Sequence, residues 1–187
     1  ISGSASTSDL TITAGNDIFL DAGAAGSVYA SGAAGTANTA FGNDAGIALT
    51  GNYNTLYGSQ AGKAITSGAN NVAIGRNSLA THVDGSYNIA IGVGAMGDTD
   101  EDTTVDGSLG NIMIGEGAGG GAWATAVSNY NIGIGYEAMR GVMNGALNNT
   151  AIGKDALKAI TIGDGNIAIG VGAGDSITDG AENVCIG

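Results

Sequence analysis

The sequence contains no proline, one cysteine, one tryptophan and only 5 Lys or Arg residues in 187. Because collagen needs abundant proline and glycine at every third position, a collagen triple helix is excluded. The lone Cys185 cannot form an intramolecular disulfide, so disulfides do not define the fold. The 17 acidic residues give a formal net charge of −12, which repels phosphate backbones and anionic lipids. We therefore expect no nucleic-acid partner.

Long hydrophobic runs are also missing. The longest stretch without charge, residues 22–43, consists mainly of Gly, Ala, Ser, Thr and Asn, and is too polar for a bilayer core. We therefore expect no membrane insertion. The chain opens at Ile1 without a basic and then apolar leader, so we expect a fragment or processed product. With 43% hydrophobic residues, the sequence is too apolar for a disordered chain.

A repeat dominates what is present: Asn, two residues, an Ile or aromatic residue, and Gly. This motif occurs nine times in steps of 16 to 23 residues, most often 17. So regular a period predicts an all-β fold, a parallel β-solenoid (β-roll) of about nine coils over residues 38–187. Residues 9–23 alternate apolar and polar side chains, so we expect residues 1–37 to form an N-terminal β-cap and connector.

Each part of the motif has a physical reason. The three residues between Asn and Gly alternate in character and predict a short strand. The asparagines of successive coils can hydrogen-bond in an amide ladder, and the glycines permit a corner with positive φ. A second apolar element before the next turn predicts a second strand in each coil. The residues predicted to form this structural ladder include Asn54, Asn71, Asn88, Asn149, Asn166, Gly58, Gly75, Gly92, Gly153 and Gly170.

The alternation also predicts which strand residues face the interior. We expect the bulky residues, such as Val72 and Ile74, to point inward and the small residue between them to point outward. The outward column would contain Ala40, Ala73, Ala90, Ala151 and Ala168, and Cys185 occupies the same position as a small filler. Because each coil buries little apolar area, we expect this flat stripe to join copies into a homotrimer.

The motif as it stands in Asn71–Gly75, Asn88–Gly92 and Asn149–Gly153 resembles the head repeats of trimeric autotransporter adhesins. Residues Asn149–Leu157 are even more similar to the repeats of tail fibre proteins of tailed bacteriophages, and Leu10–Gly23 is similar to segments that precede such repeats. The resemblance implies a trimeric, extracellular binding rod located in the tail fibre of a virion. Its expected partners are a host cell-surface glycan or protein and other virion tail proteins.

The longest interval between motifs holds an acidic loop with Asp98, Asp100, Asp102 and Asp106. Oxygen ligands at alternate positions are suited to Ca²⁺, but the glycine and glutamate of a helix-loop-helix calcium site are missing. Both a calcium site and a plain solvated loop stay open. We expect no other cofactor.

Four aromatic residues are candidates for receptor contact. Trp123 stands in a segment that breaks the period, where it can contact a ligand or fold back over the rod as a lid. Tyr53, Tyr87 and Tyr130 each precede a motif asparagine and can form a strip for stacking glycans, or instead cover a turn or an interface. His82 has no second His or Cys nearby for zinc, and we expect it at the surface.

The sequence predicts a structural protein without enzymatic activity. Two G-x-G-x-x-G matches follow from the repeat and lack the strand–helix setting of a nucleotide site, and no nucleophile elbow is present. The leading hypothesis is the structural and receptor-binding segment of a viral tail fibre that attaches to a bacterial host. The alternatives are the head of a bacterial trimeric adhesin and, in a different class, an ice-binding solenoid that presents ranks of Thr.

Overall fold

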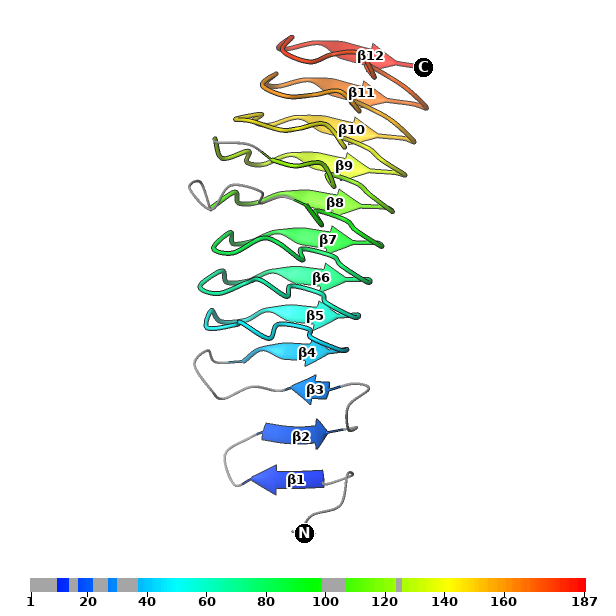
Figure 1. Cartoon of the computed structure of the whole chain (residues 1–187). Coiled ribbons are helices and arrows are strands. Elements are labelled where there is room, and N and C mark those ends of the chain that lie inside the picture. The colour runs from blue at the N-terminus through cyan, green and yellow to red at the C-terminus, as the bar shows by residue number, and fades with distance from the viewer. Residues whose placement is uncertain (1–9, 14–16, 22–26, 30–36, 99–106, 124–125) are drawn as a thin grey trace.

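The computed structural model describes residues 10–13, 17–21, 27–29, 37–98, 107–123 and 126–187. Its strands form one 12-stranded sheet in sequence order (Figure 1). The first three strands, β1 (Leu10–Thr13), β2 (Asp17–Asp21) and β3 (Ser27–Tyr29), pair antiparallel. The rest are β4 (Thr39–Phe41), β5 (Thr55–Tyr57), β6 (Val72–Ile74), β7 (Ile89–Ile91), β8 (Ile112–Ile114), β9 (Ile132–Ile134), β10 (Thr150–Ile152), β11 (Ile167–Ile169) and β12 (Val184–Ile186).

The nine strands β4 to β12 are parallel and stack as successive coils of a solenoid, which confirms the predicted fold class. We number the coils 1 to 9, so that coil 1 contains β4 and coil 9 contains β12 (Figure 1). Strand β3 still pairs antiparallel with β4, so the pairing changes beside the predicted boundary at residue 38.

The register between coils is constant. Ala73 lies opposite Ala90, and Ile74 lies opposite Ile91, so the same motif position pairs with itself throughout β4 to β12. Side chains of equivalent residues therefore stack in columns parallel to the rod axis, at the strand spacing of about 4.8 Å.

The motif asparagines form the expected ladder in the interior. The Asn71 backbone N–H donates to the Asn54 side-chain oxygen at 3.0 Å, and the Asn71 side-chain nitrogen donates to the Gly85 carbonyl at 2.8 Å. The Asn88 N–H in turn donates to the Asn71 side-chain oxygen at 2.9 Å. Each amide thus ties its own coil closed and joins it to the next coil. The buried members are Asn38, Asn54, Asn71, Asn88, Asn111, Asn131, Asn149 and Asn166.

The motif glycines lie at corners that no other residue fits. Gly58 has φ +139°, and an added Cβ would lie 2.6 Å from the backbone carbon and oxygen of Gly75 in the next coil. The backbones of adjacent coils therefore approach too closely at this corner for any side chain.

Each coil has a single strand in the described part of the chain, so the prediction of a second strand per coil is wrong. In coil 2, the segment after the corner turns on itself, since the Ile65 N–H donates to the Gly62 carbonyl at 3.1 Å. The same segment still bonds to the next coil, where the Thr66 N–H donates to the Val83 carbonyl at 2.8 Å. Hydrogen bonds three residues back keep this side of the coil curved rather than extended.

The predicted direction of the strand side chains is also wrong. The small central residues Ala40, Ala73, Ala90, Ala151 and Ala168 point into the interior and are buried. The bulky residues on either side point outward, so that Ile74 is 38% exposed and Ile134 is 36% exposed. The reason is lack of space in the narrow interior. The ladder asparagines occupy much of it, together with a buried column of small residues that stand three positions after each motif glycine, such as Ala45, Ala61 and Ser78.

One site in the remaining interior space holds a single large side chain in coils 2 to 7, supplied from either of two positions. These are the central residue of the strand and the fourth residue after the motif glycine, which we call the corner position. In coil 5 the strand supplies Met113 and the corner position holds Gly119, where an added Cβ would lie 2.8 Å from the Met113 Cγ. Coil 6 reverses the arrangement, with Gly133 in the strand and buried Met139 at the corner.

Coil 2 resembles coil 5, with the large residue in the strand (Leu56) and glycine at the corner position (Gly62). Coils 3, 4 and 7 resemble coil 6, with a small strand residue and a large corner residue: Ala73 and Leu79, Ala90 and Met96, and Ala151 and Leu157. A second site, seven or eight residues after the motif glycine, holds further buried residues such as Ile65, Met143 and Ile160.

We predict that Asn131→Ala destabilises the solenoid by about 2–4 kcal/mol, because it leaves several buried groups without a partner. These include the Asn149 N–H, which donates to Asn131 at 3.0 Å, and the Ala146 carbonyl, which accepts from Asn131 at 2.8 Å. Urea unfolding followed by circular dichroism measures the loss. The control is Asn43→Ala at an exposed position. Equal midpoints for the two variants would contradict a stabilising ladder.

The exchange between strand and corner predicts a compensating pair of substitutions. Met113→Ala should cost about 2–5 kcal/mol by opening a cavity, and Gly119→Met about 1–3 kcal/mol by overpacking. The double variant reproduces the Ala90 and Met96 arrangement of coil 4 and should recover at least about 1 kcal/mol relative to the sum. A double-mutant cycle in urea tests this, and strict additivity would show that the two side chains do not share one space.

Candidate functional site

The most extensive surface feature is the outer face of strands β4 to β12. Two columns of outward side chains run along it, one on each side of the central residue of each strand, which is buried in β4 to β11. Near its N-terminal end the rings of Phe41 and Tyr57 stack with centroids 4.9 Å apart. The first column is Thr39, Thr55, Val72, Ile89, Ile112, Ile132, Thr150, Ile167 and Val184, and the second is Phe41, Tyr57, Ile74, Ile91, Ile114, Ile134, Ile152, Ile169 and Ile186. We call these 18 residues the strand face.

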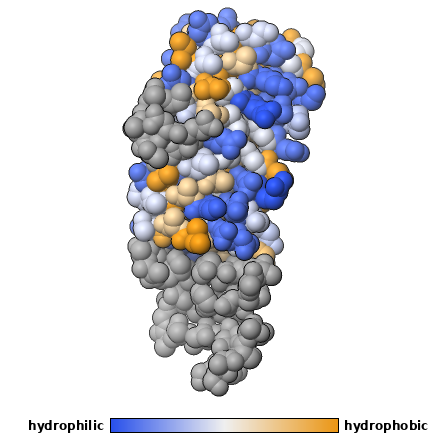
Figure 2. Space-filling view, in the orientation of Figure 1, coloured by the Kyte–Doolittle hydropathy of each residue, from blue (hydrophilic) through white to orange (hydrophobic). Residues whose placement is uncertain are grey.

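The strand face carries no charged residue, although the whole chain has 22. In the space-filling view, strongly hydrophilic residues gather together on the visible side of the solenoid, with apolar residues on either side of them (Figure 2). Exposed apolar residues also lie outside the strand face, among them Val93, Tyr136 and Val171, but there they share a motif position with charged residues such as Arg76 and Glu116. A continuous, charge-free and largely apolar face of this kind is typical of an interaction surface.

The three candidate tyrosines lie together in one column. Tyr53, Tyr87 and Tyr130 are 59%, 64% and 57% exposed, and all three have a left-handed backbone with φ of 59°, 61° and 58°. They occupy coils 2, 4 and 6 at the start of the strand, next to the buried ladder asparagine. The sequence pattern thus brings together three exposed rings that are far apart in the chain.

Trp123 takes the second of its two predicted arrangements. It is 3% exposed, packs in the core cluster, and donates its ring N–H to the Gly119 carbonyl at 3.0 Å. A ligand on the surface therefore cannot reach the face of this ring, and the expectation of a receptor contact by Trp123 is replaced by a lid over the interior.

His82 is 2% exposed, so the prediction of a surface histidine is wrong. Its ring nitrogen Nε2 lies 3.2 Å from both the Ser108 carbonyl oxygen and the Asn88 side-chain nitrogen. His82 stands seven residues after its motif glycine, where coils 2 and 7 place the buried Ile65 and Ile160. Aligning the sequences of the coils at their motif glycines would have indicated that His82 lies in the interior.

The calcium candidate lies mostly outside the described residues. Asp100, Asp102 and Asp106 belong to the segment 99–106, and of the four only Asp98 is described, with an exposed side chain. Among the residues that the structure describes, no three His, Cys, Asp or Glu side chains come together as metal ligands. The calcium hypothesis therefore stays a prediction from the sequence.

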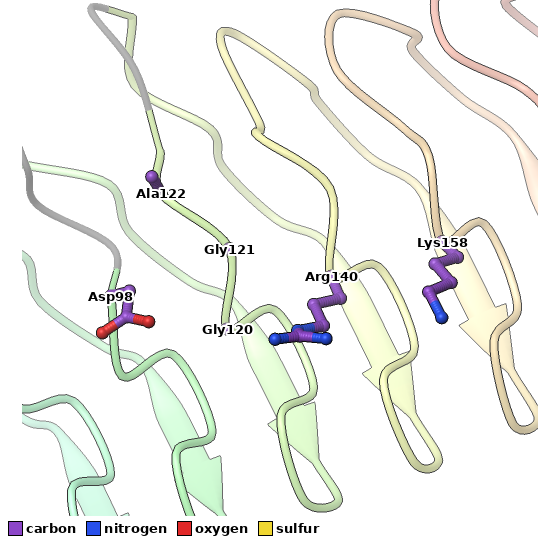
Figure 3. A pocket seen from close by; sticks show the side chains of 6 residues that line it. All are labelled: Asp98, Gly120, Gly121, Ala122, Arg140 and Lys158. Carbon is purple, nitrogen blue, oxygen red and sulfur yellow. The ribbon is translucent and has the colours of Figure 1, made fainter.

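A shallow depression of about 380 Å³ lies on the side of the solenoid after the strand ends. Asp98, Gly120, Arg140 and Lys158 line it from four successive coils (Figure 3). Its cations already have partners: Arg140 bonds Glu137 at 2.8 Å, and Lys158 bonds Glu137 at 2.7 Å and Asp155 at 3.0 Å. The cluster joins adjacent coils at the surface.

These ion pairs shift the pKa values of the residues that form them. The hydrogen bond from Lys158 is the main cause that lowers the pKa of both Glu137 and Asp155 below the usual range. The same bonds raise the pKa of Lys158, with Glu137 contributing most. A hydrogen bond with Glu137 also raises the pKa of Tyr136. In coil 3, hydrogen bonds from Ser67 and Thr66 lower the pKa of Asp84.

The threonines do not form the continuous rank that an ice-binding face needs. Thr50 and Thr66 share one column, because the Thr50 N–H donates to the Thr66 carbonyl at 2.8 Å. The Thr66 N–H then donates to Val83, so Val83 and not Thr81 continues that column. Thr161 and Thr178 form a second, separate pair.

No protein-family model, curated protein or solved structure matches this chain. In the described part of the chain, no helix has the length and apolar character to cross a membrane.

We predict that Lys158→Met raises the pKa of Glu137 and Asp155 toward ordinary values, as measured by NMR titration of the side-chain carboxyl groups. Since both native pKa values are lowered, the pairs stabilise the folded chain at neutral pH, and this contribution is lost as the pH falls through those values. It is also lost in strong base, as the pH rises through the raised pKa of Lys158.

Lys63→Met, which removes an exposed cation from another coil, is the control and should leave both carboxyl titrations unchanged. Because these groups are exposed, the change in thermal midpoint should be small in either variant. Unshifted titrations in Lys158→Met would contradict the ion pairs.

Proposed function

We propose that this chain is a structural and receptor-binding segment of a viral tail fibre, which works as a parallel homotrimer and attaches to a bacterial host surface. The observation that carries the proposal is the strand face, a charge-free and largely apolar surface that runs along nine coils. Its mechanical part is a rod that holds binding residues at fixed intervals. No catalytic step is part of the proposal.

The strand face supports self-association for a reason of size. Eight steps of about 4.8 Å and a strand of three residues give a flat area on the order of 400 Å². A soluble monomer rarely leaves a larger apolar patch open without a use. A stable pairwise interface buries about 800 Å² per partner, so two copies joined by this face alone would be weakly held. Three copies around one axis let each copy contact two others, and residues beside the face enlarge the contact.

Charge supports the same arrangement. With a net charge of −12, identical chains repel one another, and acidic groups within the contact surface would add to that repulsion at the shortest distances. The strand face avoids this added repulsion, because its 18 positions hold only Ile, Val, Thr, Phe and Tyr. Association through the strand face replaces the earlier expectation of association through Ala40, Ala73 and the other small residues, which are buried.

Receptor binding is assigned to the remaining exposed columns. Three copies of each column on one fibre, and several fibres on one particle, turn weak individual contacts into firm attachment. The resemblance of the repeats to tail fibre sequences favours a viral origin, and the same surfaces would serve the head of a bacterial trimeric adhesin. The interrupted Thr column gives the ice-binding alternative no support.

Attachment is tested with the purified chain and with bacteria. A fluorescently labelled chain should bind the surface of a restricted set of strains and compete with phage adsorption to those strains. Binding to every strain tested, or to none, would contradict a receptor-binding role. Binding without competition for phage would favour the adhesin alternative.

We predict that the chain is a trimer at micromolar concentration and that Ile134→Asp converts it to a monomer. Ile134 is 36% exposed, so the substitution leaves the core of a single chain intact but adds a charge to each copy of the strand face. Sedimentation equilibrium measures the mass. Val142→Asp, at a 48% exposed apolar position outside the strand face, should stay trimeric. A monomeric wild-type chain would overturn the trimer.

A further inference from the structure

The column that contains the exposed tyrosines has a uniform backbone. The residue before each ladder asparagine has φ between 57° and 69° in coils 2 to 9, whether it is Tyr, Asn, Gly or Glu. Its N–H donates to a carbonyl of the preceding coil at 2.9–3.1 Å in coils 3 to 9. These residues are therefore in register, and their side chains leave the rod from equivalent points.

Within this column, Tyr53, Tyr87 and Tyr130 recur at every second coil, and we call them the tyrosine row. Two coils correspond to about 9.6 Å along the axis. Coil 5, between Tyr87 and Tyr130, has Gly110, and the Tyr130 ring lies over it, since a Cβ on Gly110 would be 2.7 Å from the Tyr130 Cδ1. Each of the three tyrosines is nevertheless more than half exposed.

The groups around the tyrosine row are neutral and polar. The exposed Asn70 shares the column in coil 3, and Asn129 lies one residue before Tyr130 with its side-chain oxygen accepting from the Leu109 N–H at 2.8 Å. All five Lys and Arg residues follow a motif glycine by one to five positions, at the other end of the strand. The cations are Lys63, Arg76, Arg140, Lys154 and Lys158. With no cation beside it and a net charge of −12, the row does not suit an anionic ligand.

We propose that the tyrosine row binds an extended, neutral polysaccharide that lies parallel to the rod axis. This inference rests on the proposed attachment function and names its ligand class. A residue of an extended, equatorially linked pyranose chain advances by about one strand spacing, so alternate sugars meet successive rings. The apolar faces of the sugars stack on the tyrosines, and the exposed Asn70 amide between Tyr53 and Tyr87 bonds the hydroxyl groups.

The geometry predicts a dependence on chain length. Tyr53 and Tyr130 are four coils apart, so about five consecutive sugars reach all three rings. Isothermal titration calorimetry with β-1,4-linked glucose and N-acetylglucosamine oligomers should show affinity rising up to the pentamer and then levelling. Electrophoresis in native gels that contain hydroxyethylcellulose or mannan tests the polymers themselves.

Tyr87→Ala removes the middle ring and should weaken pentamer binding about tenfold, the factor expected from one stacked aromatic ring. The matched control is Tyr136→Ala, which removes a 44% exposed tyrosine at the other end of the strand and should leave affinity unchanged. Both variants should keep the oligomeric state of the wild type. Dissociation of the Tyr87→Ala assembly would identify the row as a protein interface and overturn the proposal.

Gly165→Tyr tests the spacing by gain of function. Gly165 occupies the column in coil 8, two coils beyond Tyr130, with φ +66°, and an added Cβ has no atom closer than 3.8 Å. A fourth ring there should move the plateau of affinity from the pentamer to the heptamer. The same substitution at Asn148, only one coil beyond Tyr130, should not move it.

The two levels of the proposal fail differently. If labelled chain binds host bacteria but Tyr87→Ala binds them equally well and no oligomer binds, the polysaccharide site is wrong and attachment stands. If the chain binds neutral oligomers with the expected length dependence but binds no bacteria, the site stands and the attachment function is wrong. Binding that is independent of chain length would overturn the axial alignment.

Discussion

The buried asparagine ladder is the interaction on which the rest of the structure depends. A coil of a solenoid cannot satisfy all of its own backbone groups, because the partners of many of them lie in the coils above and below. The amide of Asn71 accepts from the following coil and donates to the Gly85 carbonyl within its own coil. One side chain therefore sets both the closure of a coil and its register with the next. Every column on the rod, inside or outside, inherits its alignment from this repeated bond.

The ladder also limits how the rod can be stabilised. It occupies interior space that apolar side chains would otherwise fill, and a described coil buries at most two further large apolar residues, such as Met139 and Met143 in coil 6. With so little apolar area buried per coil, a single chain offsets its conformational entropy only narrowly. The isoleucines that cannot fit inside lie on the strand face. The same narrowness that weakens one chain thus provides the surface through which copies can stabilise one another.

The sequence predicts the architecture well because the period, the asparagines and the glycines each have one structural use. It predicts the strand orientation poorly, because alternation of period two shows that a strand has two faces but not which face is inside. Size is the usual guide, with bulky residues inside, and it fails where the interior is already occupied. Ile74 lies outside and Ala73 inside for that reason.

In the candidate site, too, the sequence predicts some side-chain positions and misses others. The positions of Tyr53, Tyr87 and Tyr130 could be predicted from their place before the motif asparagine, and their exposure follows from it. The burial of Trp123 could not be predicted, because it stands in a coil whose length departs from the period and so has no aligned counterpart. His82 could have been placed inside by comparison with Ile65, but a titratable residue in a core column contradicts the usual preference.

The backbone conformation and the exposure of the three tyrosines together bear on whether they are more than surface filling. Their column requires a left-handed backbone, which glycine adopts freely and which costs other residues about 1–2 kcal/mol. Coils 5 and 8 use Gly110 and Gly165 there, so the fold itself does not need a side chain at this position. A bulky aromatic residue at positive φ is uncommon, and such strained positions cluster at functional sites. Asn70, Asn148 and Glu182 adopt the same backbone in other coils, so the conformation belongs to the fold, and what sets the three tyrosines apart is a bulky, exposed ring at alternate coils. That combination agrees with the proposed contact to a ligand outside the folded chain.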